Sequence, residues 1–237
     1  FQLESNGIKD VLRRLKPTCF EDIIAVNALY RPGPLGSGMV EDFILRKQGK
    51  QKITYTFPEL ADILKETYGV IVYQEQVMKI ATAIAGYSLG ESDILRRAMG
   101  KKKAEEMSKQ KEIFVSRAIE RKFDKKKADD LFELMAYFAG YGFNKSHSAA
   151  YALIAYQTAY LKAHFEVEFM AGLITLELSH PETTLAYLKE VKKSHIKLLT
   201  PDINISIATF TPEEKSIRWG LLGIKNVGEI AAEDILK

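Results

Sequence analysis

The sequence has little cysteine, little histidine and no long apolar run. A single cysteine, Cys19, among 237 residues excludes an internal disulfide and a zinc site built from several thiolates. No apolar stretch approaches the length of a membrane span, and the first residues lack the basic and apolar series of a signal peptide. These absences are typical of a globular protein in a reducing compartment, and we predict a cytoplasmic protein without membrane contact.

Carboxylate arrangements suited to metal catalysis are also missing. A two-metal nucleotidyl-transfer site needs carboxylates that converge from neighbouring strands, but no Asp-x-Asp motif falls on a predicted strand. The adjacent acidic pairs at 21–22, 41–42 and 129–130 fall on amphipathic helices, where exposed surface is the expected role. The 4 histidines are scattered singly. We therefore predict no catalytic residue and no metal ligand within this chain.

The charge is small in sum but uneven in distribution. The formal net charge of +3 does not by itself indicate a nucleic-acid partner. Between residues 96 and 127, however, basic side chains are dense, which predicts a local positive field. They are Arg96, Arg97, Lys101, Lys102, Lys103, Lys109, Lys111, Arg117, Arg121, Lys122, Lys125, Lys126 and Lys127.

One stretch, FAGYGFNKSHSAAYALIAYQTAYLKAHF at residues 138–165, joins a glycine-containing loop to a long apolar helix. Residues 148–163 are apolar on most faces, which predicts a buried helix. Asn144, Lys145 and His147 stand at its start. The unpaired backbone N–H groups and the positive dipole end found there favour an anion such as phosphate. Alternatively, the polar residues only cap the helix, the glycines only turn the chain and the aromatic residues belong to the core.

Hydrophobic periodicity predicts a mainly α fold. Residues 196–219 differ, because prolines, β-branched residues and short alternating runs predict a boundary or a small strand-bearing insert. We expect a multi-helix domain at 1–178 and a small, partial α+β region at 179–237, the whole being a piece of a longer protein. The predicted helices are 5–16, 20–30, 39–47, 58–66, 77–86, 88–100, 104–122, 126–139, 148–163, 167–178 and 181–195.

The last segment, LLGIKNVGEIAAEDIL at residues 221–236, has the spacing of a helix-hairpin-helix motif. In that motif, hairpin amides contact the backbone of a nucleic acid. Asn226 stands where the hairpin usually has its first glycine, and asparagine tolerates the positive φ that such a turn requires.

Three further segments each allow two interpretations. In RPGPLGSG, residues 31–38, prolines and glycines exclude regular structure; the loop is either a rigid connector or presents Arg31 and backbone amides to a ligand. The polar residues 74–76 are either solvated or hydrogen-bonded to a substrate or template strand. The lysines at 101–103 either form a solvated face or contact phosphates.

Several long blocks occur together in one order. They are FQLES, LYRPGPLGSGM, YGVIVYQEQVM, GYSLGESDILRRAMGKKK and FAGYGFNKSHSAAYALIAYQTAYLKAHFEVEFMA. Together these blocks resemble the fingers region of bacterial replicative DNA polymerase III alpha subunits (family C). The resemblance covers residues 1–178 as fingers and the remainder as the start of a tandem helix-hairpin-helix region. Asn226 departs from the family pattern, and this departure concerns only the assignment of the hairpin.

The resemblance implies template-directed DNA synthesis, in which the fingers close over the incoming deoxynucleoside triphosphate and the templating base. The catalytic aspartates would lie in the palm, before Phe1, so this chain should bind without catalysing, and Mg²⁺ would be a cofactor of the full-length enzyme only. The blocks LRRAMGKKK and GYGFNKSHS would line the nucleotide pocket. Nucleotide binding is thereby implied for Arg96, Arg97, Tyr141, Asn144, Lys145 and His147, and DNA binding for Lys101, Lys102, Lys103, Lys225 and Gly228.

The implied partners are primer-template DNA, deoxynucleoside triphosphates and other subunits of the replicative holoenzyme, including the sliding clamp through regions outside this chain. Two other functions remain open from the residues alone: a helical nucleic-acid-binding module of a repair or recombination factor without a nucleotide pocket, and a structural helical scaffold. The polymerase hypothesis expects the arginine pair and the start of the helix at 148–163 to share one site.

Overall fold

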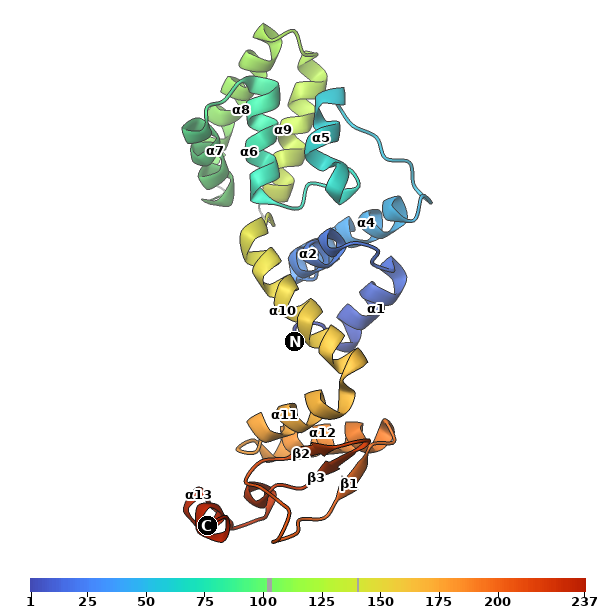
Figure 1. Ribbon diagram of the computed structural model, residues 1–237. Helices are drawn as coiled ribbons and strands as arrows, with labels where there is room; N and C mark the ends of the chain where they lie inside the picture. Colours follow the sequence, from blue (N-terminus) through green and yellow to red (C-terminus); the bar gives the residue numbers. More distant parts are fainter. Residues whose placement is uncertain (102–103, 140) are drawn as a thin grey trace. The chain divides into compact units, whose positions relative to one another are not determined.

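The computed structural model describes residues 1–101, 104–139 and 141–237. Helices predominate in this part of the chain, which confirms the predicted mainly α class (Figure 1). The α-helices are α1 (Asn6–Leu15), α2 (Phe20–Leu29), α3 (Pro32–Gly36), α4 (Met39–Lys47), α5 (Ala61–Leu64), α6 (Gln74–Ala85), α7 (Leu89–Lys101), α8 (Ala104–Glu120), α9 (Lys125–Ala139), α10 (Lys145–His164), α11 (Glu166–Leu176), α12 (Pro181–Lys193) and α13 (Glu229–Ile235).

The chain forms two compact units, unit 1 (Phe1–Ala155) and unit 2 (Tyr156–Lys237). The division falls inside α10, so one continuous helix contributes residues to both units. The sequence analysis predicted a domain boundary at residue 178. This division into compact units does not test that boundary, which stays a prediction. Within the described part of the chain, every helix is too short or too polar to cross a membrane.

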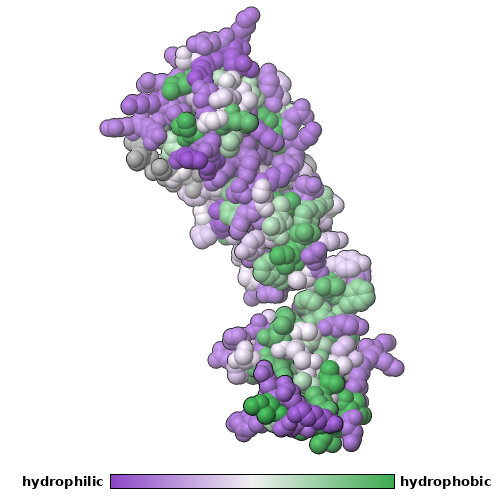
Figure 2. All heavy atoms as spheres, turned by 60° about the vertical axis from the view of Figure 1, so that its left-hand side comes forward, coloured by the Kyte–Doolittle hydropathy of each residue, from purple (hydrophilic) through white to green (hydrophobic). Residues whose placement is uncertain are grey.

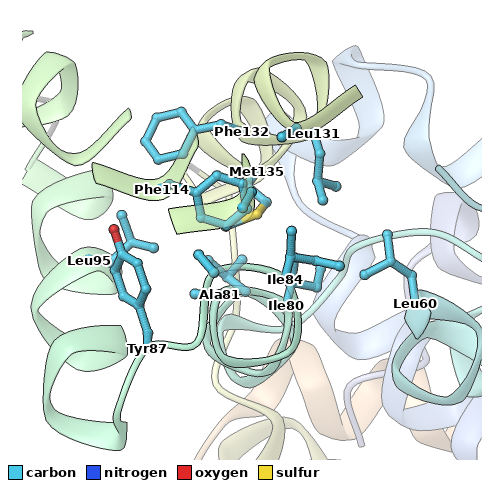
Figure 3. Close-up of a cluster of buried hydrophobic side chains, with 14 of the residues drawn as sticks. Leu60, Ile80, Ala81, Ile84, Tyr87, Leu95, Phe114, Leu131, Phe132 and Met135 are labelled. Carbon is cyan, nitrogen blue, oxygen red and sulfur yellow. The ribbon is translucent and has the colours of Figure 1, made fainter. Parts of the chain in front are cut away.

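Unit 1 contains two hydrophobic cores, and the first lies among α6, α7, α8 and α9. Figure 3 shows Ile80, Ala81 and Ile84 of α6 pointing toward aromatic and aliphatic side chains of α8 and α9. Phe114 and Phe132 are fully enclosed there, with ring centroids 5.5 Å apart. This core fixes the positions of α6 and α7. The start of α6 and Arg96 of α7 belong to the candidate site described below.

The second core of unit 1 is built from α1, α2 and α4. Their apolar faces pack together with Val70, Val72 and Tyr73, which lead into α6, and with Ala152 of α10. Ser5 caps α1 as its sequence position predicts, because its hydroxyl oxygen accepts a hydrogen bond from the backbone N–H of Ile8 at 3.4 Å. The second core thus places the start of α6 against the first half of α10.

The long helix α10 is less buried than its apolar sequence predicts. Only the small residues Ser148, Ala152 and Ala155 are buried, at the i, i+4 and i+7 spacing of one helical stripe. Large apolar side chains on its other faces are exposed, among them Leu153 at 49 %. Figure 2 shows apolar residues at the surface over the stretch of chain that contains α10. The prediction of a buried helix was wrong because the small residues alone provide the packing face.

Two short segments also differ from their predictions. Residues 31–38 were expected to lack regular structure, yet Pro32–Gly36 form the short helix α3. Proline fits there because the first N–H groups of a helix have no intrahelical acceptor, so their absence costs no hydrogen bond. The helix predicted at 58–66 is instead divided into the 3₁₀ turn η1 (Pro58–Leu60), the helix α5 and the 3₁₀ turn η2 (Lys65–Thr67).

Unit 2 contains a small mixed sheet, as the composition of residues 196–219 predicts. β3 (Ser216–Arg218) lies between β1 (Lys197–Leu199), to which it is parallel, and β2 (Thr211–Glu213), to which it is antiparallel. The hydrophobic core of unit 2 is formed by side chains of α11, α12 and the sheet, and Met170 and Ile217 are fully buried in it. The 3₁₀ turn η3 (Leu221–Gly223) and α13 follow this sheet.

Candidate functional site

The candidate site lies in unit 1, where two segments distant in sequence meet just before the helices α6 and α10. Tyr73 and Phe143 form a parallel β-bridge. The N–H of Phe143 donates to the carbonyl of Val72 at 3.3 Å, and the N–H of Gln74 donates to the carbonyl of Phe143 at 3.0 Å. The first turns of α6 and α10 are therefore held side by side by backbone hydrogen bonds.

Asn144 caps α10 and connects it to α6. Its side-chain oxygen accepts a hydrogen bond from the backbone N–H of His147 at 2.8 Å, the bond expected of an N-cap residue. Its side-chain amide donates to a carboxylate oxygen of Glu75 at 2.9 Å. Ser148, which is also an N-cap residue type, instead donates its hydroxyl to the carbonyl of Ile24 at 2.6 Å in the core. Asn144, and not Ser148, is thus the residue that caps α10.

The first turn of α10 binds an anion that belongs to the chain itself. The backbone N–H of Lys145 donates to both carboxylate oxygens of Glu75, at 3.2 and 3.1 Å. The ammonium of Lys145 contacts a carboxylate oxygen of Glu66 at 2.6 Å and lies 5.5 Å from the ring centroid of Tyr73. Glu75 thus occupies a backbone donor of the type that phosphate uses at a helix N-terminus, and Glu66 occupies the ammonium of the same residue.

The arginine pair of α7 is anchored by one carboxylate. Arg96 and Arg97 each form an ion pair with Asp93, at N···O distances of 2.8 Å. The guanidinium of Arg96 beside it is the main cause that holds the pKa of Asp93 below its ordinary value. Arg97 is the more exposed of the two, with 66 % of its side chain accessible. Asp93 therefore fixes both guanidinium groups while leaving Arg97 open to a ligand.

Gln74 connects Arg96 to the loop before α10. Its side-chain oxygen accepts a hydrogen bond from Nη1 of Arg96 at 3.2 Å, and its side-chain amide donates to the carbonyl of Gly142 at 3.2 Å. Because Glu75 follows directly and contacts Lys145, two successive residues of α6 join α7 to α10. The structure thus brings Arg96, Asn144 and Lys145 to one place.

Tyr141 precedes the α10 cap residue Asn144 in the sequence, His147 follows it, and both contact aromatic rings. The imidazole centroid of His147 is 5.3 Å from the ring of Phe143 and 4.6 Å from that of Tyr151. The ring of Tyr141 meets that of Tyr137 edge to face, with centroids 5.9 Å apart. The carbonyl oxygen of Tyr141 accepts a hydrogen bond from Nη2 of Arg31 at 2.6 Å.

Sequence analysis left residues 74–76 as either solvated or hydrogen-bonded to a substrate or template strand, and it did not anticipate their hydrogen bonds within the protein. All three make specific hydrogen bonds. Gln76 is 2 % exposed, and its side-chain oxygen accepts from the N–H groups of Val72 and Tyr73 at 2.8 and 2.9 Å. Their position directly after a buried run was the available signal, because polar groups beside a core must find partners.

The basic region of α7, α8 and α9 is partly neutralised by acidic neighbours. Lys111 forms ion pairs with Asp129 at 3.0 Å and with Glu133 at 2.6 Å. Arg117 pairs with Glu91 at 2.8 Å, and this hydrogen bond is the main cause that lowers the pKa of Glu91 to about 2. The net positive field around α8 is therefore weaker than the count of lysines and arginines suggests.

The residues expected to contact DNA are placed in several locations. Lys101 is the last residue of α7, while Lys102 and Lys103 lie outside the described residues. In unit 2, Lys225 is exposed and Gly228 is the N-cap residue of α13. Between them Asn226 has φ of 71°, which confirms the expected positive φ. Among the residues that the structure describes, no group of three or more His, Cys, Asp or Glu side chains could hold a metal ion.

Comparison with known proteins gives matches along the whole chain. Residues 1–122 match the family model described as the bacterial DNA polymerase III alpha subunit finger domain, and residues 195–237 match a helix-hairpin-helix motif. The chain is similar to "DNA polymerase III subunit alpha" of Campylobacter jejuni (54 % identical, 100 % of this chain, 20 % of that protein), of Treponema pallidum (52 %, 99 %, 20 %) and of Escherichia coli K12 (49 %, 100 %, 21 %). It spans about a fifth of the length of these curated relatives.

Proposed function

Because this chain belongs to the bacterial DNA polymerase III alpha subunit finger domain family, we propose that it is the fingers segment of a replicative DNA polymerase. In this role it binds the incoming deoxynucleoside triphosphate and the template strand during template-directed DNA synthesis. The parent protein is then a DNA-directed DNA polymerase, and this chain contributes binding groups to it.

One observation carries the proposal: cationic and backbone donors from α7 and α10 meet at the first turn of α6. Arg96 reaches this turn through Gln74, and Lys145 reaches it through Glu75. A triphosphate distributes negative charge over several oxygens, so it is bound best by pre-placed donors that come from more than one direction. The geometry supports a polyphosphate ligand better than a diffuse contact with DNA.

Binding would exchange one set of anions for another. In the described state Glu66 and Glu75 satisfy the ammonium and the backbone N–H of Lys145. A triphosphate carries more negative charge than either carboxylate, so it competes for the same donors once it enters. We propose that Arg97, which is 66 % exposed on α7, and His147, in the first turn of α10, add further contacts, and that Tyr141 contacts the sugar or base. The two carboxylates would keep the donors satisfied until the substrate arrives.

We propose that the chemical step belongs to the rest of the polymerase. The catalytic aspartates and the Mg²⁺ that they hold would lie in the palm, outside this chain. The groups of this chain instead stabilise the charge of the polyphosphate and orient it, which requires no proton transfer by their side chains. On this view the isolated chain is inactive.

Unit 2 would contact the DNA backbone. Lys225 and Gly228 lie within the range of the helix-hairpin-helix match, and we propose that they belong to the hairpin, where an exposed cation and backbone amides would suit phosphate oxygens. Lys101, Lys102 and Lys103 are proposed as further phosphate contacts. None of these contacts reads the base sequence, so they would position the polymerase on DNA of any sequence.

The remaining partners follow from the parent polymerase. We propose primer-template DNA, deoxynucleoside triphosphates and the other subunits of the replicative holoenzyme, with the sliding clamp bound through regions outside this chain, and a cytoplasmic location. The alternative of a repair or recombination module lacks a supporting observation, because the matched family is that of a polymerase.

Replacing Arg97 by alanine in the full-length polymerase tests the nucleotide site. The variant should lower kcat/KM for single-nucleotide incorporation by about 10- to 100-fold, because a charge-assisted contact to the triphosphate is lost. Its affinity for duplex DNA should stay largely unchanged. The two quantities are measured by rapid quench and by fluorescence anisotropy.

Lys126→Ala is the matched control for Arg97→Ala, since it removes one exposed positive charge of the same basic region from α9. It should leave incorporation within about twofold of the wild type. Lys126 lies in the first turn of α9, at the opposite end of that helix from the loop before α10, and salt screens an exposed charge at such a distance from the nucleotide. Equal losses in the two variants would point to a general field and would remove Arg97 from the site.

By itself, this chain should bind duplex DNA weakly and with strong salt dependence. Its hairpin offers few phosphate contacts, and each contact that releases a counterion adds about 0.9 to the slope of log K against log salt. Fluorescence anisotropy titrations at salt concentrations from about 50 to about 200 mM measure this slope. Tight binding that does not change with salt would contradict the proposed backbone contacts.

A further inference from the structure

The segment Arg31–Gly33 contacts the loop before α10, although the two are 110 residues apart in sequence. The guanidinium of Arg31 makes three contacts. Its Nε donates to the carbonyl of Ala28 at 2.8 Å, its Nη2 donates to the carbonyl of Tyr141 at 2.6 Å, and its central carbon lies 4.4 Å from the ring centroid of Phe143. Arg31 thus links the end of α2 to the residues that precede Asn144.

Gly33 contacts the same loop through the absence of a side chain. A Cβ atom at this position would lie 2.3 Å from Cδ1 and 2.5 Å from Cε1 of Tyr141, closer than real Cβ atoms approach any neighbour. Gly33 lies within the short helix α3, so its backbone angles are open to other residues. Glycine is needed here for close packing against the Tyr141 ring.

The short helix α3 gives these two contacts a rigid base. Pro32 occupies its first position, where its fixed φ suits a helix start. The N–H of Leu35 donates to the carbonyl of Arg31 at 3.0 Å, and the N–H of Ser37 donates to that of Gly33 at 3.2 Å. The prolines and glycines of residues 31–38 therefore form a short hydrogen-bonded helix that begins next to Arg31 and contains Gly33.

We propose that Arg31 and Gly33 are positioning residues for the nucleotide site. Arg31 is committed to two carbonyl oxygens and an aromatic ring, so it acts through the loop and leaves phosphate binding to other cations. By holding Tyr141 and Phe143, the pair fixes where the Tyr141 ring and the first turn of α10 stand. This inference rests on the proposed function, because it assigns the support of the same nucleotide site.

Gly33→Ala in the full-length polymerase tests the contact with Tyr141. It should raise the KM for the incoming nucleotide by about 10-fold, with a smaller change in kcat, because a ring displaced by an ångström no longer fits its ligand. Gly36→Ala is the matched control: it lies in the same helix, and a Cβ there would meet nothing within 4 Å. Gly36→Ala should leave KM within about twofold of the wild type, since it creates no clash.

A double-mutant cycle separates this mechanism from general destabilisation. In a Tyr141→Ala background the ring that Gly33→Ala would displace is gone, so adding Gly33→Ala should change KM no further. If the two substitutions multiply their effects, Gly33 does not act through Tyr141 and the proposal is overturned. Thermal melting of each variant shows that the compared proteins are folded.

Arg31→Lys distinguishes positioning from a charge effect. Lysine keeps the positive charge but lacks the planar fork that reaches both carbonyl oxygens. The variant should raise KM about as much as Arg31→Ala, because both lose the clamp. Recovery of wild-type KM by Arg31→Lys would show that charge alone suffices, and would overturn the positioning role.

Hydrogen exchange provides a readout that needs no nucleotide. Both Gly33→Ala and Arg31→Lys should speed amide exchange at residues 141–147 by at least about 10-fold, because local opening becomes easier when the clamp is lost. Unchanged exchange would overturn the clamp itself. Faster exchange with an unchanged KM would overturn its link to the site, and failure of Arg97→Ala would refute the proposed function separately.

Discussion

Replacing Lys145 by alanine in the full-length polymerase is expected to lower kcat/KM for nucleotide incorporation by about 100-fold, the scale on which the loss of one pre-placed donor affects a charged transition state. Lys145 is the one predicted residue whose ammonium and backbone N–H both face anionic oxygens in the described structure. Single-turnover incorporation on a primer-template measures the effect, and duplex DNA affinity should change little.

The fold should tolerate this substitution. The ion pair between Lys145 and Glu66 is partly exposed, at 35 % and 31 % of the two side chains, so solvent screening limits its contribution to stability to less than about 1 kcal/mol. The cap by Asn144 and the backbone hydrogen bonds to Glu75 do not involve the Lys145 side chain. Wild-type incorporation kinetics for Lys145→Ala would remove the Lys145 ammonium from the proposed triphosphate site.

Glu66→Gln provides a comparison with the opposite expected sign. It keeps the size of the side chain and removes the charge that competes for the ammonium of Lys145. If the triphosphate displaces this carboxylate, KM for the nucleotide should fall by about threefold, because less of the binding energy is spent on breaking an exposed ion pair. A raised KM would show instead that Glu66 holds Lys145 in its productive position.

Asp22→Asn is expected to destabilise unit 1 by about 3 kcal/mol, the cost typical of removing one partner from a buried ion pair. Asp22 is fully buried, and its carboxylate contacts the ammonium of Lys47 at 3.3 Å. It also accepts hydrogen bonds from the N–H of Thr18 at 2.9 Å and the hydroxyl of Tyr68 at 2.8 Å. One side chain thus joins α2, the end of α4 and the turn that leads to α6.

Denaturation followed by far-UV circular dichroism measures this loss, because unit 1 contains most of the helices. Trp219, the single tryptophan, lies in unit 2, so its fluorescence reports separately whether that unit is affected. Tyr68→Phe is the graded control: it removes one hydroxyl donor to Asp22 and should cost about 1 kcal/mol. An unchanged dichroism midpoint for Asp22→Asn would refute the structural role of this pair.

The same carboxylate predicts a pH dependence of stability. Burial raises the pKa of Asp22, but the N–H of Thr18, the hydroxyl of Tyr68 and the ammonium of Lys47 outweigh it and hold the pKa below its ordinary value. A lowered native pKa stabilises the fold above the unfolded pKa of about 4, and this contribution is lost as the pH falls through the native pKa. Asp22→Asn should therefore lack this part of the acid sensitivity.

Local signals in the sequence predicted much of the secondary structure correctly. Ser5 precedes a periodic apolar stretch and caps α1, and Ser88 accepts a hydrogen bond from the N–H of Glu91 at 3.3 Å at the start of α7. Asn226 adopts a positive φ, as a substitute for glycine should. These features depend on neighbouring residues alone, which is why a one-dimensional pattern was sufficient.

Two other predictions were wrong because they depended on tertiary packing. The composition of residues 148–163 indicated burial on most faces, but only the small residues of α10 meet the core. The prolines of residues 31–38 indicated an irregular loop, yet Pro32 fits the first position of α3. In both cases the outcome depended on which neighbours were present, and a propensity carries no information about neighbours.

By itself, the sequence determined the helical class, the family and the identity of the cationic residues, since these follow from composition, periodicity and blocks of adjacent residues. Only the tertiary structure decided that Glu75 occupies the start of α10, that Gln74 joins Arg96 to the loop, and that Arg31 and Gly33 hold Tyr141. The physical reason is distance along the chain. Hydrogen bonds and close contacts between residues 70 or 110 positions apart arise only after the cores of unit 1 have brought their helices together.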